Sequence, residues 1–209
     1  MKQYLFLISF ILSIPFLAWS QVIDSTRFVN LQDALKKPNS VRILDLSNQQ
    51  FQNFPIEITT LKNLEVLILK NDHFKILPKE IVKLKKLRIL DLTGNDLVQL
   101  PKEFNQLTNL EELYLNELSM FNFEEGISAI QQLPKLRTLH LENNNLESLP
   151  YNLYSLKKLE QLYINNNSLR AIPEDIKRMK TLKFLQISQN KSQLNQDKSI
   201  HDWGLKIEF

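Results

Sequence analysis

The chain has 209 residues, a length that suits one domain, and its 26 basic and 23 acidic side chains leave a formal net charge of only +3. This balance gives no electrostatic argument for nucleic-acid binding, which needs a concentrated basic stripe. The absence of cysteine excludes disulfides, cysteine nucleophiles and a lipid anchor on an N-terminal cysteine.

The first twenty residues differ in composition from the rest. Lys2 is the only charged residue before Asp24, and an apolar run, LFLISFILSIPFLAW, lies between them. Two small residues, Ala18 and Ser20, then flank Trp19, a pattern typical of a secretory signal peptide. We predict cleavage after Ser20 and no membrane insertion of the mature chain; an uncleaved anchor is the alternative. Export without cysteine favours a bacterial periplasmic or secreted protein.

After an N-terminal cap over 21–40, one pattern repeats about seven times over 41–190. Most copies are 23 residues long, as the step from 64 to 87 shows, and read LxxLxLxxNxLxxLPxxIxxLxx. Self-similarity at roughly 20–29 residues with this motif predicts a repeat solenoid. The copies start at Val41, Leu64, Leu87, Leu110, Leu136, Leu159 and Leu182.

Apolar residues alternate at positions 4 and 6 of each copy, which predicts a short β-strand. Proline at position 15 suits the turn into a returning arm, because its φ is fixed and it has no donor. One copy buries too little apolar surface to offset the entropy of ordering it. The copies must therefore stack, with their strands paired in parallel.

Two further positions predict ladders between copies. Position 9 favours asparagine, whose amide can satisfy backbone groups of neighbouring coils; the structural ladder is Asn95, Asn144, Asn167 and Asn190. Gln49, Asp72 and Leu118 replace it elsewhere, so the ladder should be weakest in the first half. Position 2 alternates in charge, which favours cross-strand pairs that hold the register over a ligand role; its residues are Arg42, Glu65, Arg88, Glu111, Arg137, Glu160 and Lys183.

The ends and the fourth copy depart from the pattern. Asn30 to Lys37 predicts a capping helix, and Ser199 to Phe209 predicts a closing strand within a C-terminal cap over 191–209. The fourth copy has 26 residues, from 110 to 135, and lacks the Leu-Pro pair. Its spacing predicts a longer convex helix, which is either a tolerated insertion or part of a binding site.

These residues resemble the leucine-rich-repeat family, in its 23-residue class with an LPxxIxxL arm, and the flanks resemble exported bacterial members. The resemblance implies an α/β repeat solenoid: an arc with a parallel concave sheet, irregular or short-helical convex arms, and a cap at each end. It also implies protein binding through the concave face, usually without a cofactor.

Positions 3, 5, 7 and 8 should face solvent on the concave side, because side chains alternate along a strand. An apolar cluster and a row of aromatic side chains on consecutive strands then suggest an interaction surface. Both features can also serve only to stabilise the sheet. The candidate ligand-binding residues are Ile43, Asp45, Val66, Ile68, Ile89, Asp91, Tyr114, His140, Glu142 and Tyr163.

No pattern predicts an enzyme, a metal site or a cofactor. The histidines His73, His140 and His201 lie in different parts of the solenoid, and there is no Gly-rich loop or G-x-S-x-G motif. We expect an exported module that binds another protein, not nucleic acid, with a monomer favoured. The alternatives are an envelope glycan binder, using Asp45, Asp91 and the tyrosines with asparagines at position 8, and a structural oligomerisation module.

Overall fold

The computed structural model describes residues 26–51, 53–191 and 204–208. The predicted signal peptide and its cleavage after Ser20 lie outside these residues. Over the described ranges, no helix has the length and apolar character needed to cross a membrane.

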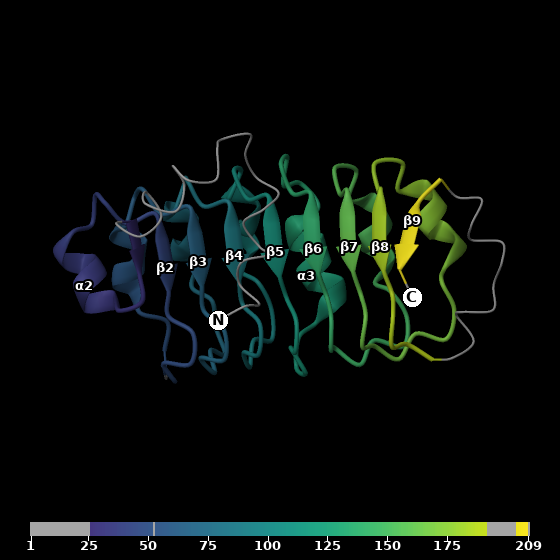
Figure 1. Ribbon diagram of the computed structural model, residues 1–209, viewed down its shortest axis with the longest axis horizontal. Helices are drawn as coiled ribbons and strands as arrows, with labels where there is room; N and C mark the ends of the chain where they lie inside the picture. The colour runs from purple at the N-terminus through teal and green to yellow at the C-terminus, as the bar shows by residue number, and fades with distance from the viewer. Residues whose placement is uncertain (1–25, 52, 192–203, 209) are drawn as a thin grey trace.

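The described chain forms one sheet of nine parallel strands in sequence order, with the returning arms behind it (Figure 1). Residues at the same repeat position are paired, for example Ile43 with Val66 and Val66 with Ile89. The predicted parallel arc is therefore confirmed. The strands are β1 (Arg27–Phe28), β2 (Ile43–Asp45), β3 (Val66–Ile68), β4 (Ile89–Asp91), β5 (Glu112–Tyr114), β6 (Thr138–His140), β7 (Gln161–Tyr163), β8 (Phe184–Gln186) and β9 (Lys206–Glu208).

The returning arms are short 3₁₀ helices, each preceded by a proline whose φ lies between −55° and −70°. Proline supplies this φ without strain, which explains its place in the repeat. The arms are η1 (Ile56–Thr60), η2 (Lys79–Lys83), η3 (Lys102–Gln106), η4 (Tyr151–Ser155) and η5 (Glu174–Arg178).

The fourth coil has an α-helix in place of this arm. Helix α3 (Phe123–Ile130) begins after Asn122, whose side chain accepts a hydrogen bond from the Glu125 backbone N–H. Gly126 lies against Phe121, since a Cβ at that glycine would meet the ring at 2.2 Å. The predicted longer convex helix is confirmed.

The ends of the solenoid also agree with the sequence. Helix α2 (Leu31–Lys36) begins after Asn30, whose side chain accepts a hydrogen bond from the Asp33 N–H. Strand β9 pairs in parallel with β8, as expected for a closing strand. Trp203 and Phe209, which the same prediction included, lie outside the described residues.

One continuous apolar core lies between the sheet and the arms. The central residue of every strand from β2 to β8 is fully buried, and stacked coils cover it on both sides. These residues are Leu44, Leu67, Leu90, Leu113, Leu139, Leu162 and Leu185.

The asparagine ladder links the turns that follow the strands. Asn167 Oδ1 accepts from the backbone N–H groups of Asn144 and Leu146, and its Nδ2 donates to the carbonyls of Leu141 and Ile164. Asn95, Asn144 and Asn190 also bond to backbone groups of an adjacent coil. The predicted structural role is confirmed.

Asp72 occupies the same place in the first half of the solenoid. Its Oδ1 accepts from the Gln49 N–H at 2.7 Å, but its Oδ2 is buried without a hydrogen-bond partner among the described residues. Burial raises the pKa of Asp72 to about 6, although hydrogen bonds from the Gln49 and Gln50 backbone oppose the rise. This defect agrees with the predicted weakness of the ladder in the first half.

Position 8 of every coil lies in the left-handed region, with φ between 55° and 68°. Asparagine and glycine adopt this conformation more readily than other residues. The asparagines at this position therefore have a backbone role, whatever they do for a ligand. The residues are Asn48, Asn71, Gly94, Glu117, Asn143, Asn166 and Gln189.

The charges at position 2 form ion pairs across the sheet. Arg88 binds Glu111 at 2.8 Å, Lys183 binds Glu160 at 2.6 Å, and the Arg42–Glu65 and Arg137–Glu160 pairs are also closed. The predicted pairing is confirmed. Exposed pairs of this kind contribute about 0–1 kcal/mol each, so they favour the observed register more than they add stability.

Candidate ligand-binding face

Tyr114, His140 and Tyr163 stack across β5, β6 and β7. The His140 ring centroid lies 3.8 Å from that of Tyr114 and 4.3 Å from that of Tyr163, with ring planes within 10° of parallel. The three residues are paired in register, so the strand spacing of about 4.8 Å brings their faces into contact. Phe184 extends the row, tilted by 50° at 5.3 Å from Tyr163.

Two carboxylates hold the edge of the His140 ring. Its Nε2 lies 3.1 Å from Glu112 Oε1, and its Nδ1 lies 3.3 Å from Glu142 Oε1. Burial alone would lower the pKa of His140, but the hydrogen bonds to these carboxylates outweigh it and raise the pKa above the usual value. The carboxylates therefore stabilise the imidazolium form relative to that of an ordinary histidine.

The flanking tyrosines remain neutral donors. Tyr114 O–H donates to Glu112 Oε1 at 2.6 Å, and Tyr163 O–H donates to Gln161 Oε1 at 3.1 Å. Burial, and the negative charge of Glu112 beside it, raise the pKa of both hydroxyls. Each ring is thus held by stacking on its face and by a hydrogen bond at its tip.

Beside the row, two buried acceptors have no hydrogen-bond partner among the described residues. They are Glu142 Oε2 and Asn165 Oδ1. Both residues stand at position 7, on adjacent coils joined by the bond from the Asn143 N–H to the Asn165 carbonyl. A buried acceptor without a donor costs about 1–3 kcal/mol.

The middle of the concave face is less exposed than the alternation predicts. Ile89, Asp91, Tyr114 and His140 are only 8%, 9%, 9% and 7% exposed. The expectation that positions 3 and 5 face open solvent is therefore wrong for these four. Large side chains on strands about 4.8 Å apart cover one another, as the stacked rings show.

The rest of the predicted apolar cluster is half-buried. Ile43 on β2 lies beside Val66 on the adjacent strand β3. Ile68 is also on β3, at position 5 of that copy, two residues after Val66. Ile89 completes the cluster from β4, so the register brings these side chains together. They form a continuous apolar surface next to the aromatic row.

The two candidate aspartates already have partners. Asp45 forms an ion pair with Arg27 at 3.0 Å and accepts from the Ser47 hydroxyl at 2.7 Å. Asp91 accepts from the Thr93 N–H at 2.9 Å, and burial raises its pKa. These contacts give both carboxylates a structural role within the sheet and its turns.

Three contributors to this face were not among the sequence candidates: Glu112, Asn165 and Phe184. Glu112 reaches His140 diagonally across 28 residues, so no spacing within one copy reveals the contact. A signal was present, since position 3 turns polar at Glu112 where the aromatic row begins. No group of three His, Asp or Glu side chains within the described ranges is arranged to hold a metal ion.

Comparisons with known proteins agree with the repeat pattern of the sequence. One family model, for a leucine-rich repeat region, matches residues 26–127, and a second, for the leucine rich repeat, matches residues 134–191. None of the curated proteins compared with the chain matches it.

Three solved structures show what the fold resembles. A leucine-rich-repeat protein of Leptospira interrogans is 31% identical, with a TM-score of 0.54, over 78% of this chain and 53% of its own. The plant peptide hormone receptor RGFR1, in complex with RGF2, is 27% identical, with a TM-score of 0.58, over 78% of this chain and 27% of its own. TLR13, in complex with ssRNA13, is 26% identical, with a TM-score of 0.66, over 81% and 27%. This chain thus spans about half of the first protein and about a quarter of the other two.

Proposed function

Because the chain belongs to the leucine-rich-repeat family, whose fold generally serves as an interaction scaffold rather than an enzyme, we propose that this protein binds another protein on its concave sheet. The observation that carries the proposal is the half-buried end of the aromatic row at Tyr163, held by stacking on His140, beside the half-buried apolar cluster of Ile43, Val66 and Ile68. Aromatic anchors contribute strongly to protein interfaces.

Rigidity is the proposed mechanism of recognition. The ring stack, the ladder of asparagines and the closed ion pairs hold the concave side chains in place before a partner arrives. Little side-chain entropy then remains to be lost on binding, which favours affinity for a given contact area. The apolar cluster on β2 to β4 would supply a second contact beside the aromatic row.

The neighbours support a protein partner without identifying one. RGFR1 is in complex with the peptide hormone RGF2, whereas TLR13 is in complex with ssRNA13. The concave face of this chain carries Glu112 and Glu142 beside the aromatic row, and their negative charge would disfavour the phosphates of a nucleic acid. We therefore favour a protein over a nucleic acid at this face.

Two pairs of substitutions test the proposal. Ile68→Gln with Tyr163→Gln removes one apolar and one aromatic contact from the concave face. Ile76→Gln with Tyr151→Gln makes the same chemical change at side chains that are 76% and 72% exposed elsewhere. Each protein would serve as bait for extracts of the native source, and captured proteins would be identified by mass spectrometry.

We expect one partner to be retained by the wild type and the outer pair and lost by the concave pair. Matched melting temperatures would confirm that the concave pair is folded. A partner retained equally by all three proteins would exclude these two residues as a binding surface, and loss by the outer pair alone would place the interface elsewhere.

We further propose that the protein is exported and acts in the periplasm or outside the cell of a bacterium. The basic start, apolar run and small residues before position 21 support this, together with the absence of cysteine. Mass spectrometry of the protein isolated from each cell fraction tests it. A mature N-terminus at Gln21 is expected, and an intact N-terminus in the cytosol would contradict it.

A further inference from the structure

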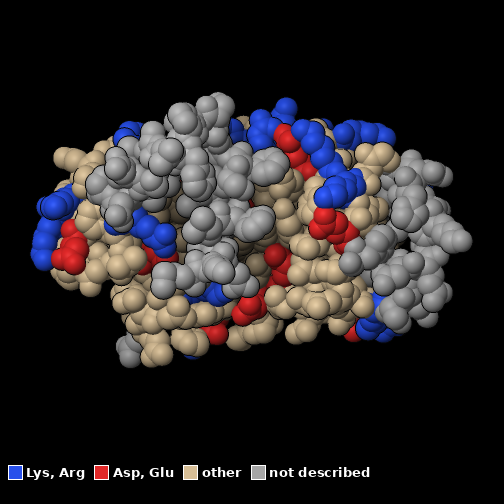
Figure 2. Space-filling view, viewed as in Figure 1, with Lys and Arg blue, Asp and Glu red and all other residues tan. Residues whose placement is uncertain are grey.

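Exposed lysines gather along the edge of the arc where the strands begin. They occupy positions 22 and 23, or the last position of the longer fourth copy, in the turns before β3, β4, β6, β7 and β8. The turn before β5 has Thr108 and Asn109 instead. Figure 2 shows Lys and Arg along the upper edge of the molecule, above a face with more acidic side chains at its centre. We name this group the lysine edge: Lys62, Lys85, Lys86, Lys135, Lys157, Lys158 and Lys180.

The charge of the lysine edge is not neutralised within the described residues. None of its members forms an ion pair there, whereas the neighbouring arginines at position 2 are paired with glutamates. Lys86 and Lys135 donate instead to Asn63 Oδ1 and Asn109 Oδ1, each at 2.7 Å. A neutral amide orients the ammonium group and leaves its charge available.

The spacing of the edge follows that of the coils. From Lys62 to Lys180 there are five steps between coils, which at about 4.8 Å each span about 24 Å. The positive charges therefore form a line and not a compact patch. A line of this kind complements an extended polyanion.

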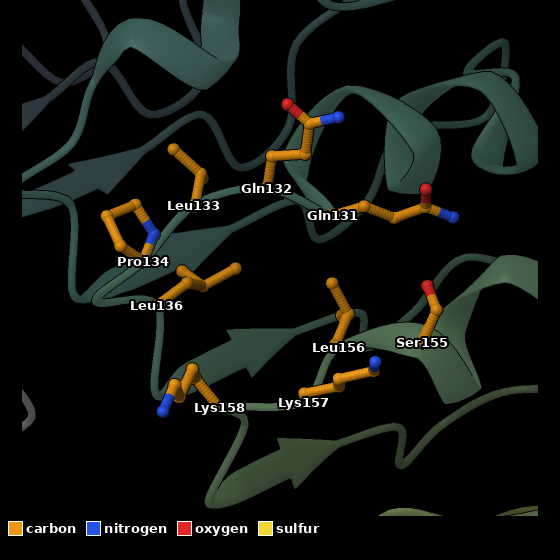
Figure 3. Close-up of a pocket in the computed structure, with 9 residues that line it drawn as sticks. All are labelled: Gln131, Gln132, Leu133, Pro134, Leu136, Ser155, Leu156, Lys157 and Lys158. Carbon is orange, nitrogen blue, oxygen red and sulfur yellow. The ribbon is translucent and has the colours of Figure 1, made fainter.

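A pocket lies on the same edge, between the end of α3 and η4. Figure 3 shows Gln131 and Gln132 on one side of it, and Lys157 and Lys158 on the other. Its volume is about 340 Å³, near the lower limit of roughly 300–1,000 Å³ for small-molecule sites. The remaining lining residues are Leu133, Pro134, Leu136, Ser155 and Leu156.

The irregular fourth coil accounts for the position of the pocket. Its 26 residues contain α3, whereas the next coil returns through the tighter 3₁₀ helix η4. An α-helix is wider than a 3₁₀ helix, so the two arms do not match where they end. The floor of the pocket is thus formed by leucines that are only 3–4% exposed, with exposed Pro134 and the amide and ammonium groups around it.

We infer that the lysine edge binds an acidic polysaccharide, laid across successive coils with one sugar ring in this pocket. Sulfate or carboxylate groups would pair with the lysines. The C–H face of a sugar ring would lie on Pro134, and its hydroxyls would bond to Gln131 and Gln132. None of the nine lining residues is aromatic, so the pocket lacks the ring on which a nucleic-acid base would stack.

The test measures binding of the purified full chain to immobilised heparin over a range of salt concentrations. The triple variant Lys135→Gln, Lys157→Gln and Lys158→Gln should bind at least about tenfold more weakly. The magnitude of the slope of log K against log salt concentration should fall by up to about three, because three fewer ion contacts release fewer counterions on binding. Arginine at the same three positions should preserve binding.

Two controls separate a site from net charge. Lys75→Gln, Lys79→Gln and Lys102→Gln make the same change in charge at exposed lysines away from the edge, and should leave binding unchanged. Gln131→Ala with Gln132→Ala should weaken binding without altering the salt slope, because it removes only uncharged contacts. The concave pair Ile68→Gln and Tyr163→Gln should bind heparin normally, so this inference can fail or hold independently of the protein-binding proposal.

Four results would overturn the inference. They are no heparin binding at low salt, equal losses in the edge and control triples, heparin binding that depends on the concave pair, and equal or tighter binding to oligo(dT) or to vesicles of anionic lipid through the same lysines. The last would assign the edge to nucleic acid or to a membrane surface.

Discussion

Replacing Asp72 with asparagine should stabilise the protein at neutral pH. The Asp72 side chain is fully buried, and its Oδ2 has no hydrogen-bond partner among the described residues. At the same position, Asn167 uses its Nδ2 to donate to two carbonyl groups. By repeat equivalence with Asn167, an asparagine at 72 would donate to the carbonyls of Leu46 and Leu69.

The size of the effect follows from the pKa of this carboxyl. Burial raises it from 3.8 to about 6, against the opposing bonds from the Gln49 and Gln50 backbone. A difference of about two pH units corresponds to about 3 kcal/mol. An unsatisfied buried group costs about 1–3 kcal/mol by a separate argument, so we expect the Asp72→Asn variant to gain about 1–3 kcal/mol.

The effect should depend on pH in a defined direction. Because the pKa is higher in the folded state, the native protein binds more protons than the unfolded chain between about pH 4 and pH 6. The free energy of unfolding contributed by Asp72 is thus greatest below about pH 4 and falls as the pH rises through 6. Asparagine does not titrate, so the substitution should remove this fall.

Urea denaturation from pH 4 to pH 8 measures the prediction. The variant should be more stable than the wild type at pH 7.5 and nearly equal to it at pH 4. Asp96→Asn is the control, because its side chain is 42% exposed and its loss should change stability by less than about 1 kcal/mol. Equal stability of Asp72→Asn and wild type at pH 7.5, or an unchanged pH dependence, would refute the reasoning.

Three further predictions concern the turns and the aromatic row. Asn167→Leu should cost about 2–4 kcal/mol in urea denaturation, since it leaves backbone groups of two coils unpaired; a loss below about 1 kcal/mol would contradict this. Gly94→Ala should cost more than about 1 kcal/mol, because φ is +68° and the added Cβ would lie 2.0 Å from Asn71 Oδ1; a melting temperature equal to wild type would be inconsistent with it. The pKa of His140, measured by NMR, should lie above 6.5. The stabilising contribution of His140 is therefore present below pH 6.5 and is lost as the pH rises through the folded-state pKa. The His140→Gln variant should not show this loss. A measured pKa at or below 6.5 would remove the basis for that dependence.

The repeat pattern alone predicted the arc, the register and both ladders. Leu90 and its counterparts recur at the same position of every copy. Residues that share a repeat position therefore stack on one another along the solenoid, and we call each such stack a column. The same logic predicts Arg88 beside Glu111 and Tyr114 beside His140 from the sequence alone. These contacts link equivalent positions on adjacent coils, and the constant period makes them predictable.

Only the tertiary structure decided what lies off these columns. The contact between Glu112 and His140 joins different repeat positions on adjacent strands. The Oδ2 of Asp72 is buried without a donor among the described residues. The pocket beside Lys157 lies where arms of different width meet. The sequence by itself determined which residues share a column, because local periodicity is encoded along the chain. The burial, charge and open space between columns depend on how unequal coils pack, and packing is a property of the folded solenoid.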